Sequence, residues 1–133
     1  MSVAGLGFRD ACQVGSLHAV LNAALDAAAL AHGAHVSLTA LATAADKAHH
    51  PAFLQLAAEL AIPALAIDLH QLTGQTAAAS PHVPARYGGH SLAEASALAA
   101  AGIGARLLQA RCTSPDRMAT AAIAIPLSLG STP

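Results

Sequence analysis

The fold is decided by residues 3–28, which read VAGLGFRDACQVGSLHAVLNAALDAA. The run Val3–Phe8 is short, apolar and built mainly from small residues, which is typical of a buried β-strand. From Leu17 onward the apolar residues fall at i, i+3, i+4, i+7, i+8 and i+11, the spacing of one helix face. These positions hold Leu17, Val20, Leu21, Ala24, Leu25 and Ala28. Ser16 is the predicted N-cap of this helix and Gly33 its predicted end.

The same alternation of strand and helix continues along the chain. Further strands are predicted at residues 36–41, 63–67, 107–110 and 119–125, with helices at 51–60 and 91–101. The short turn at 112–117 predicts that the last two strands form an antiparallel hairpin. We therefore expect one domain over residues 1–133 with a three-layer α/β/α fold, a mostly parallel sheet and an antiparallel hairpin at one edge. Residues 73–89, rich in Gly and Pro, predict a long functional or mobile loop, and residues 126–133 a flexible tail.

The composition excludes several classes of function. Of the 133 residues, 55% are hydrophobic and 10% charged, which excludes a disordered chain. A net charge of -1 and a shortage of aromatic residues argue against a nucleic-acid partner. The N-terminus lacks a signal-peptide pattern, and the longest span without a charged residue, 27–45, carries several polar side chains, so no membrane partner is expected. Cys12 and Cys112 lack CxxC spacing and are predicted to be reduced thiols, which favours the cytoplasm.

Cationic side chains follow two of the predicted strands. Arg9 comes directly after the first strand, and the helix near Ser16 offers free N–H groups, so together they could clamp a carboxylate. Lys47 follows the second strand and should lie at the same rim; an ordinary solvated lysine is the alternative. His90 lies in the loop that leads to the helix starting at Ser91. A rim of this kind suits the binding of a small molecule with several negative charges.

Other motifs are structural or incomplete. Ser91-Leu-Ala-Glu94 matches a capping box, and this structural role is the favoured interpretation of Glu94. Gly5-Leu-Gly7-Phe-Arg9-Asp10 begins like a dinucleotide-binding fingerprint, but Asp10 stands where the third glycine should be. We interpret it as a tight exit from the strand, with a nucleotide-binding module as the alternative. The eight histidines lack metal-ligand spacing, so no metal or other cofactor is expected. No nucleophile or carboxylate pair identifies catalytic residues.

The order of several motifs resembles the CobE and CbiG C-terminal domain family of cobalamin biosynthesis. Gly5-Leu-Gly7-Phe-Arg9 resembles the start of that family. The similarity continues through Leu41-Ala-Thr43 with Lys47, and through Leu60-Ala-Ile-Pro63. It is strongest at Gly88-Gly-His-Ser91-Leu-Ala-Glu94-Ala-Ser-Ala-Leu98, and the pattern covers about residues 3–125. His50 and residues 13–15 depart from it, since relatives commonly carry an acidic residue at the position of His50.

The resemblance implies an α/β/α domain that acts on corrin-ring precursors. Two-domain relatives open a lactone on cobalt-precorrin-5A and release a two-carbon fragment, whereas this chain resembles the stand-alone CobE type of the aerobic route. The implied function is that of an accessory or carrier protein that binds a precorrin or corrinoid, with other enzymes of the pathway as partners. The alternative is a hydrolase of a precorrin-5A-type lactone. The expected substrate-binding residues are Gly7, Arg9, Ser16, Lys47, Gly88, His90, Ser91 and Glu94.

Overall fold

The computed structural model describes residues 2–33, 36–68, 92–102 and 105–126. The expectations for the loop at 73–89, for Gly88, His90 and Ser91, and for the tail after residue 126 lie outside these ranges. The described elements are β1 (Ser2–Phe8), α1 (Val14–His32), β2 (Leu38–Ala44), α2 (Pro51–Leu60), β3 (Ala64–Ile67), α4 (Leu92–Ala101), β4 (Arg106–Thr113) and β5 (Ala119–Ile125).

The five strands form one mixed sheet in the order β3-β2-β1-β5-β4. β1, β2 and β3 pair in parallel, whereas β5 pairs antiparallel with both β1 and β4. Four strands therefore point the same way and β5 alone points the opposite way. The predicted α/β fold with an antiparallel hairpin at one edge is confirmed.

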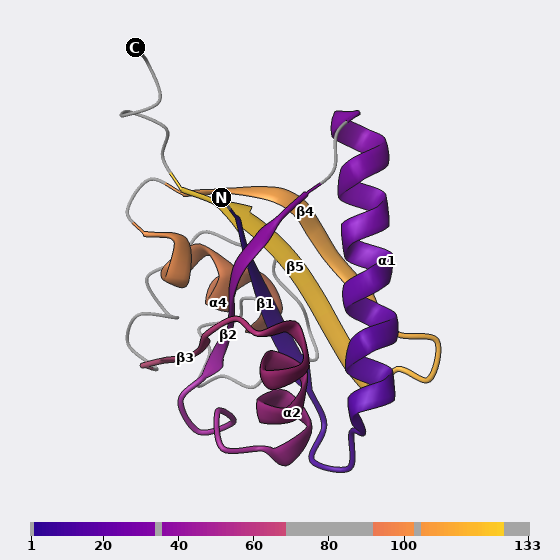
Figure 1. Cartoon of the computed structure of the whole chain (residues 1–133), viewed down its shortest axis with the longest axis vertical. Coiled ribbons are helices and arrows are strands. Elements are labelled where there is room, and N and C mark those ends of the chain that lie inside the picture. The colour runs from indigo at the N-terminus through magenta and orange to yellow at the C-terminus, as the bar shows by residue number, and fades with distance from the viewer. Residues whose placement is uncertain (1, 34–35, 69–91, 103–104, 127–133) are drawn as a thin grey trace.

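The helices cover both faces of this sheet (Figure 1). Successive side chains of a strand point to opposite faces, so the residues of β1 alternate between two cores. Ala4, Leu6 and Phe8 pack in the core that α1 and α2 cover. Val3 packs on the other face, in the cluster that holds Ala95 of α4. This arrangement confirms the three-layer prediction.

The two glycines of the incomplete fingerprint belong to β1 itself and do not form the tight strand exit that we predicted. A Cβ atom added to Gly5 would overlap the carbonyl oxygen of Ala93 and lie 2.5 Å from the backbone nitrogen of Ala97. Gly5 therefore allows α4 to pack directly against the backbone of β1, and close approach of another backbone is a known reason for a glycine in a strand interior.

Helix α1 ends as predicted but begins earlier. Gly33 closes it with left-handed backbone angles, φ 68° and ψ 18°, which glycine adopts without steric cost. The prediction of Ser16 as N-cap is wrong: the N-cap is Gln13, and Ser16 lies in the first turn. Strand β2 is also shifted from the predicted 36–41, because backbone pairing with both β1 and β3 extends it to Ala44.

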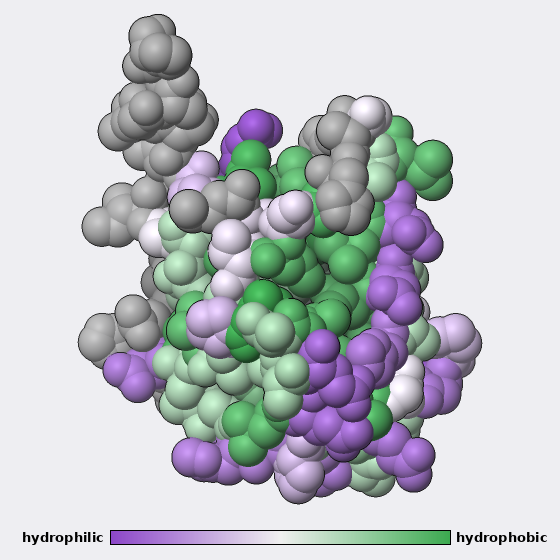
Figure 2. All heavy atoms as spheres, viewed as in Figure 1, coloured by the Kyte–Doolittle hydropathy of each residue, from purple (hydrophilic) through white to green (hydrophobic). Residues whose placement is uncertain are grey.

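Among the described residues, α1 is the helix whose length and composition would allow it to cross a membrane, over residues 14–31. Its apolar face is used within the domain, since Leu17, Val20, Leu21, Ala24 and Ala28 are buried in the core. Figure 2 shows polar side chains along the outer side of α1 and apolar ones between this helix and the strands. This is the pattern of a core helix.

Candidate functional site

The carboxyl ends of the parallel strands bring several polar groups together, and this edge is where α/β folds bind ligands. β1 ends at Phe8 and β2 at Ala44. The first residue of α4 lies at the same place, since a Cβ atom on Gly7 would be 3.5 Å from the Cβ of Leu92. The N-terminus of α4, with its partial positive charge, therefore lies beside the last residues of β1.

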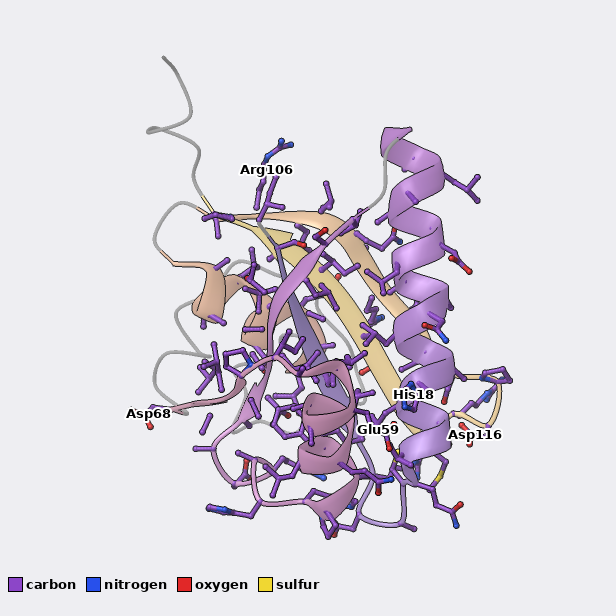
Figure 3. All side chains as sticks on the ribbon, viewed as in Figure 1. His18, Glu59, Asp68, Arg106 and Asp116 are labelled. Atoms are coloured by element: carbon purple, nitrogen blue, oxygen red, sulfur yellow. The ribbon has the colours of Figure 1, made fainter. Side chains whose placement is uncertain are left out.

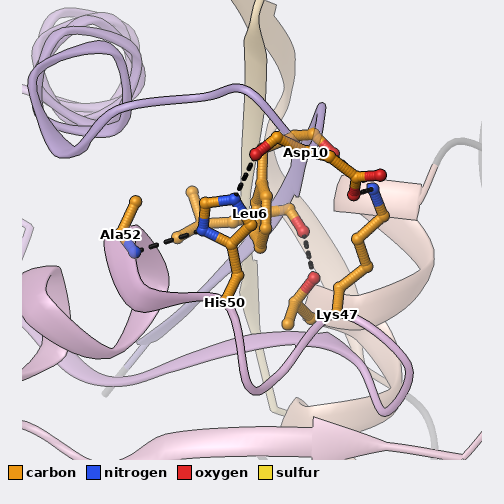
Figure 4. Close-up of polar contacts among 7 residues, drawn as sticks. Leu6, Asp10, Lys47, His50 and Ala52 are labelled. Carbon is orange, nitrogen blue, oxygen red and sulfur yellow. Dashed lines mark hydrogen bonds and ion pairs between the residues drawn. The ribbon is translucent and has the colours of Figure 1, made fainter.

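Lys47 contacts the last residue of β1 from the turn that follows β2 (Figure 4). Its Nζ donates a 2.8 Å hydrogen bond to the carbonyl oxygen of Phe8 and a 3.3 Å bond to Oδ1 of Asp10. The same nitrogen lies 5.6 Å from the centroid of the Phe8 ring. The side chain of Lys47 is only 18% exposed, whereas that of Asp10 is 98% exposed. The fold thus fixes an ammonium group at the edge of the sheet.

His50 joins two of the loops at this edge. Its Nδ1 accepts a 3.1 Å hydrogen bond from the backbone N–H of Ala52 and so caps α2. With Nδ1 acting as acceptor, the proton of the neutral ring lies on Nε2. Nε2 therefore donates the 2.7 Å hydrogen bond to the carbonyl oxygen of Asp10. The ring of Phe8 packs edge-on against the imidazole at 5.0 Å.

Arg9 lies on the hairpin side of the same loop. Its backbone N–H donates to the carbonyl oxygen of Met118 at 2.9 Å, and its Nε donates to the carbonyl oxygen of Arg117 at 3.3 Å. The side chain is exposed. Arg9 therefore lies on the β5 side of the carboxyl end of β1, and Lys47 lies on its β2 side.

Ser16 is paired with a carboxylate of the chain itself. Its hydroxyl donates to Oδ2 of Asp116, at the tip of the β4–β5 turn, while Ser114 donates to Oδ1 at 2.5 Å. The backbone N–H of Met118 also donates to Oδ1, at 3.0 Å. These hydrogen bonds, with that of Ser114 the largest contribution, lower the pKa of Asp116 from 3.8 to about 2.

An open hollow of about 370 Å³ lies beside this contact, lined by Gln13, Gly15, Ser16, Ala19, Ser114, Pro115 and Asp116. A ligand carboxylate bound at Ser16 would meet the charge of Asp116 there. Figure 3 shows Asp116 beside the N-terminal end of α1 and Arg106 at the opposite end of the molecule.

Glu94 lies in the first turn of α4, on the face of the sheet that α4 covers. Its carboxyl group is buried, with the residue 1% exposed, and Oε2 accepts a 3.3 Å hydrogen bond from the backbone N–H of Arg111 in β4. The predicted capping interaction involves Ser91, which lies outside the described residues. The contact with β4 is one that the local capping motif does not predict.

The structure thus places Gly7, Arg9 and Lys47 at the carboxyl end of β1. Ser16 and Glu94 lie in the first turns of α1 and α4 at the same edge of the sheet, but their side chains bond with Asp116 and with β4. Sequence reasoning missed two residues of this site, Asp10 and His50. Asp10 could have been found from its position directly after the first strand. The role of His50 depends on a contact 40 residues away in sequence, which no local pattern reveals.

Other reactive side chains lie outside this site. In the part of the chain that the structure describes, no group of three His, Cys, Asp or Glu could hold a metal ion. Both cysteines are free, and burial raises the pKa of each thiol. Nε2 of His18 in α1 and Oε1 of Glu59 in α2 lie 2.5 Å apart in a hydrogen bond between the two helices, and their side chains point toward each other (Figure 3).

The fold and the site define a three-layer α/β domain with cationic side chains at the carboxyl edge of its parallel strands. A family model described as "Cobalamin synthesis G C-terminus" matches residues 2–124. The chain therefore belongs to this family, and the predicted resemblance is confirmed. Membership assigns the protein to cobalamin biosynthesis.

Two solved structures of cobalamin biosynthesis proteins are similar over nearly the whole chain. CobE, described as a protein from the cobalamin (vitamin B12) biosynthetic pathway, is 32% identical with a TM-score of 0.77, over 96% of this chain and 91% of CobE. The cobalamin biosynthesis protein ChiG from Agrobacterium tumefaciens is also 32% identical, with a TM-score of 0.66, over 95% of this chain and 98% of ChiG.

A third structure shares the fold alone. It is described as a homologue of cobalamin biosynthesis protein G from Sulfolobus solfataricus, and it is 14% identical with a TM-score of 0.64. The match covers 92% of this chain and 36% of that protein. The search of curated proteins gave no match.

Proposed function

We propose that this protein binds a precorrin or corrinoid intermediate, as an accessory or carrier protein of the aerobic route to cobalamin in the cytoplasm. The observation that carries the proposal is the ammonium group of Lys47, held 2.8 Å from the carbonyl oxygen of Phe8 at the carboxyl end of β1. Precorrins carry several acetate and propionate side chains, so they need cations at fixed positions. Membership in a cobalamin-synthesis family supports this class of ligand.

The surroundings of Lys47 suit a carboxylate. A charge-assisted hydrogen bond is stronger when its donor is already oriented and shielded from water. The carbonyl of Phe8 orients the ammonium group, and the turn around Lys47 leaves only 18% of its side chain exposed. Arg9 offers a second cation on the other side of β1, and the N-terminus of α4 adds a partial positive charge.

An absorbance titration with hydrogenobyrinic acid, a metal-free corrin with free carboxylates, followed by gel filtration, tests the proposal. We expect the coloured ligand to elute with the protein and to keep its spectrum. Cyanocobalamin is the comparison ligand, because its ring carboxylates are amides. We expect it to bind about five- to thirtyfold more weakly, since two charge pairs of about 0.5–1 kcal/mol each are lost. Equal affinity for both corrinoids, or no binding, would contradict the proposal.

The fate of the ligand distinguishes the alternative function, a lactone hydrolase, from a carrier. In the same experiment, a precorrin-5A-type lactone that leaves the isolated chain with an altered spectrum and a released two-carbon fragment would favour the hydrolase. Recovery of the unchanged lactone from the complex favours the carrier.

A further inference from the structure

We propose that the carboxylate of Asp10 competes with the ligand for Lys47. It pairs with the ammonium group of Lys47 in the free protein and leaves that group when a ligand carboxylate binds. The inference rests on the proposed function, and it assigns to Asp10 control over the affinity of that site.

Lys47 makes one hydrogen bond with a backbone carbonyl, which is fixed, and one with an exposed side chain, which a ligand can replace. An ammonium group has three donors. One of them holds the carbonyl oxygen of Phe8 at 2.8 Å, and the Phe8 ring lies 5.6 Å away, so the protein side of the group is anchored. The 3.3 Å contact with Asp10 Oδ1 is longer, and it involves a side chain that is 98% exposed. Exposed ion pairs of this kind contribute about 1 kcal/mol or less, so a better-placed carboxylate can replace Asp10.

Displacement of Asp10 requires no movement of the backbone. His50 Nε2 donates to the carbonyl oxygen of Asp10 at 2.7 Å (Figure 4). The backbone N–H of Cys12 donates to the carbonyl oxygen of Arg9 at 2.9 Å. The loop is therefore clamped on both sides of Asp10, while its carboxylate reaches into solvent. Rotation about the side-chain bonds of Asp10 alone exposes Lys47 to a ligand.

The competition from Asp10 lowers the affinity for the ligand, which suits a protein that must release its ligand. The carboxylate of Asp10 repels a ligand carboxylate and competes with it for the same donor. It also pairs with the ammonium group whenever the ligand departs. The competitor acts on ligand carboxylates and has little effect on a neutral amide.

The affinity of four proteins for hydrogenobyrinic acid tests the inference: the wild type, Asp10→Asn, Lys47→Met and the double variant. Asparagine keeps the size of the side chain and a hydrogen-bond acceptor but removes the charge. We expect Asp10→Asn to bind about two- to fivefold more tightly than the wild type. We expect the gain from the same substitution to be clearly smaller in the Lys47→Met background, because the competition needs the ammonium group and only the repulsion between carboxylates remains.

Asp26→Asn is the matched control for net charge. Asp26 is exposed on α1, twelve residues after the start of the helix, which places it about 18 Å along the axis from the edge that holds Asp10. An equal gain in affinity from Asp26→Asn would show a general charge effect and overturn the inference.

The remaining outcomes separate this inference from the proposed function. If the wild type binds and Asp10→Asn binds equally or more weakly, Asp10 is not a competitor, and the proposed function still holds. If thermal unfolding shows all variants folded and the wild type does not bind, the proposed function fails, and the role of Asp10 fails with it.

Discussion

Gly5 of β1 lies directly beneath Ala93 of α4, so close that any side chain at position 5 would overlap the carbonyl oxygen of Ala93. We predict that Gly5→Ala lowers the free energy of unfolding by about 3 kcal/mol or more, because the clash is with backbone that cannot rotate away. Urea denaturation followed by circular dichroism measures the change.

Gly15→Ala is the control for this substitution. A Cβ atom on Gly15 meets no atom within 4 Å, and the residue lies in the first turn of α1. Alanine favours the helix, so we expect a gain of up to about 1 kcal/mol. Equal stability of the two variants would contradict the close packing of α4 on β1.

The two hydrogen bonds of His50 can be separated by substitution. His50→Asn keeps a good N-cap for α2 but is too short to reach the carbonyl oxygen of Asp10, whereas His50→Ala loses both bonds. We expect His50→Ala to be about 1 kcal/mol less stable than His50→Asn, the usual cost of a lost cap. Urea denaturation at pH 8 compares the two variants. A wild type no more stable than His50→Ala would show that the imidazole does not stabilise the start of α2.

Asp116 predicts a dependence of stability on pH. Its pKa in the folded protein is about 2, below the ordinary 3.8, so folding favours the ionised carboxylate. Its contribution to stability is therefore complete above about pH 4 and is lost as the pH falls from 3.8 toward 2. We expect Asp116→Asn to have a lower Tm than the wild type at pH 7, with the two values converging near pH 2.

Thermal unfolding of both proteins between pH 2 and pH 7 measures this difference. Because Asp116 is exposed and its partners are hydroxyl and backbone groups, added salt should change the difference little. A difference in Tm that stays constant down to pH 2 would show that the carboxylate is not ionised in these hydrogen bonds.

The elements whose pattern extends over many residues could be predicted from the sequence. The apolar spacing from Leu17 to Ala28 identifies the buried face of α1, and Pro51 marks the start of α2, as observed. The β4–β5 hairpin follows from the short turn between two apolar runs. In each case the physical signal lies within one element or between neighbours in sequence.

The site could be predicted only in part, because its contacts join distant parts of the chain. The hydroxyl of Ser16 has the chemistry of an N-cap, yet it bonds with Asp116, which is 100 residues away. Gly5 has the chemistry of a turn residue, but the approach of α4 explains it. Arg9 and Lys47 can be predicted because both follow strands whose carboxyl ends must meet in a parallel sheet.

Arg9 provides the last prediction, since its side chain is exposed and its bond with the Arg117 carbonyl is long, at 3.3 Å. We expect Arg9→Ala to bind hydrogenobyrinic acid about two- to fivefold more weakly, the effect of one lost charge pair, with a change in stability within about 0.5 kcal/mol. Isothermal titration at low and high salt measures the loss, which should shrink at high salt because ions screen exposed charges.

Arg106→Ala is the control for Arg9→Ala, because it distinguishes the loss of a local contact from a change in net charge. Arg106 is exposed at the opposite end of the molecule from Asp116 and the hairpin turn (Figure 3). Arg106 pairs with Ile125 and Phe8 with Ala119, so about 20 Å of strand separates Arg106 from the carboxyl end of β1. This distance exceeds the screening length of about 8 Å at physiological salt. We therefore expect Arg106→Ala to leave the affinity unchanged. An equal loss for both variants would mean that the ligand responds to the total charge and that Arg9 makes no specific contact.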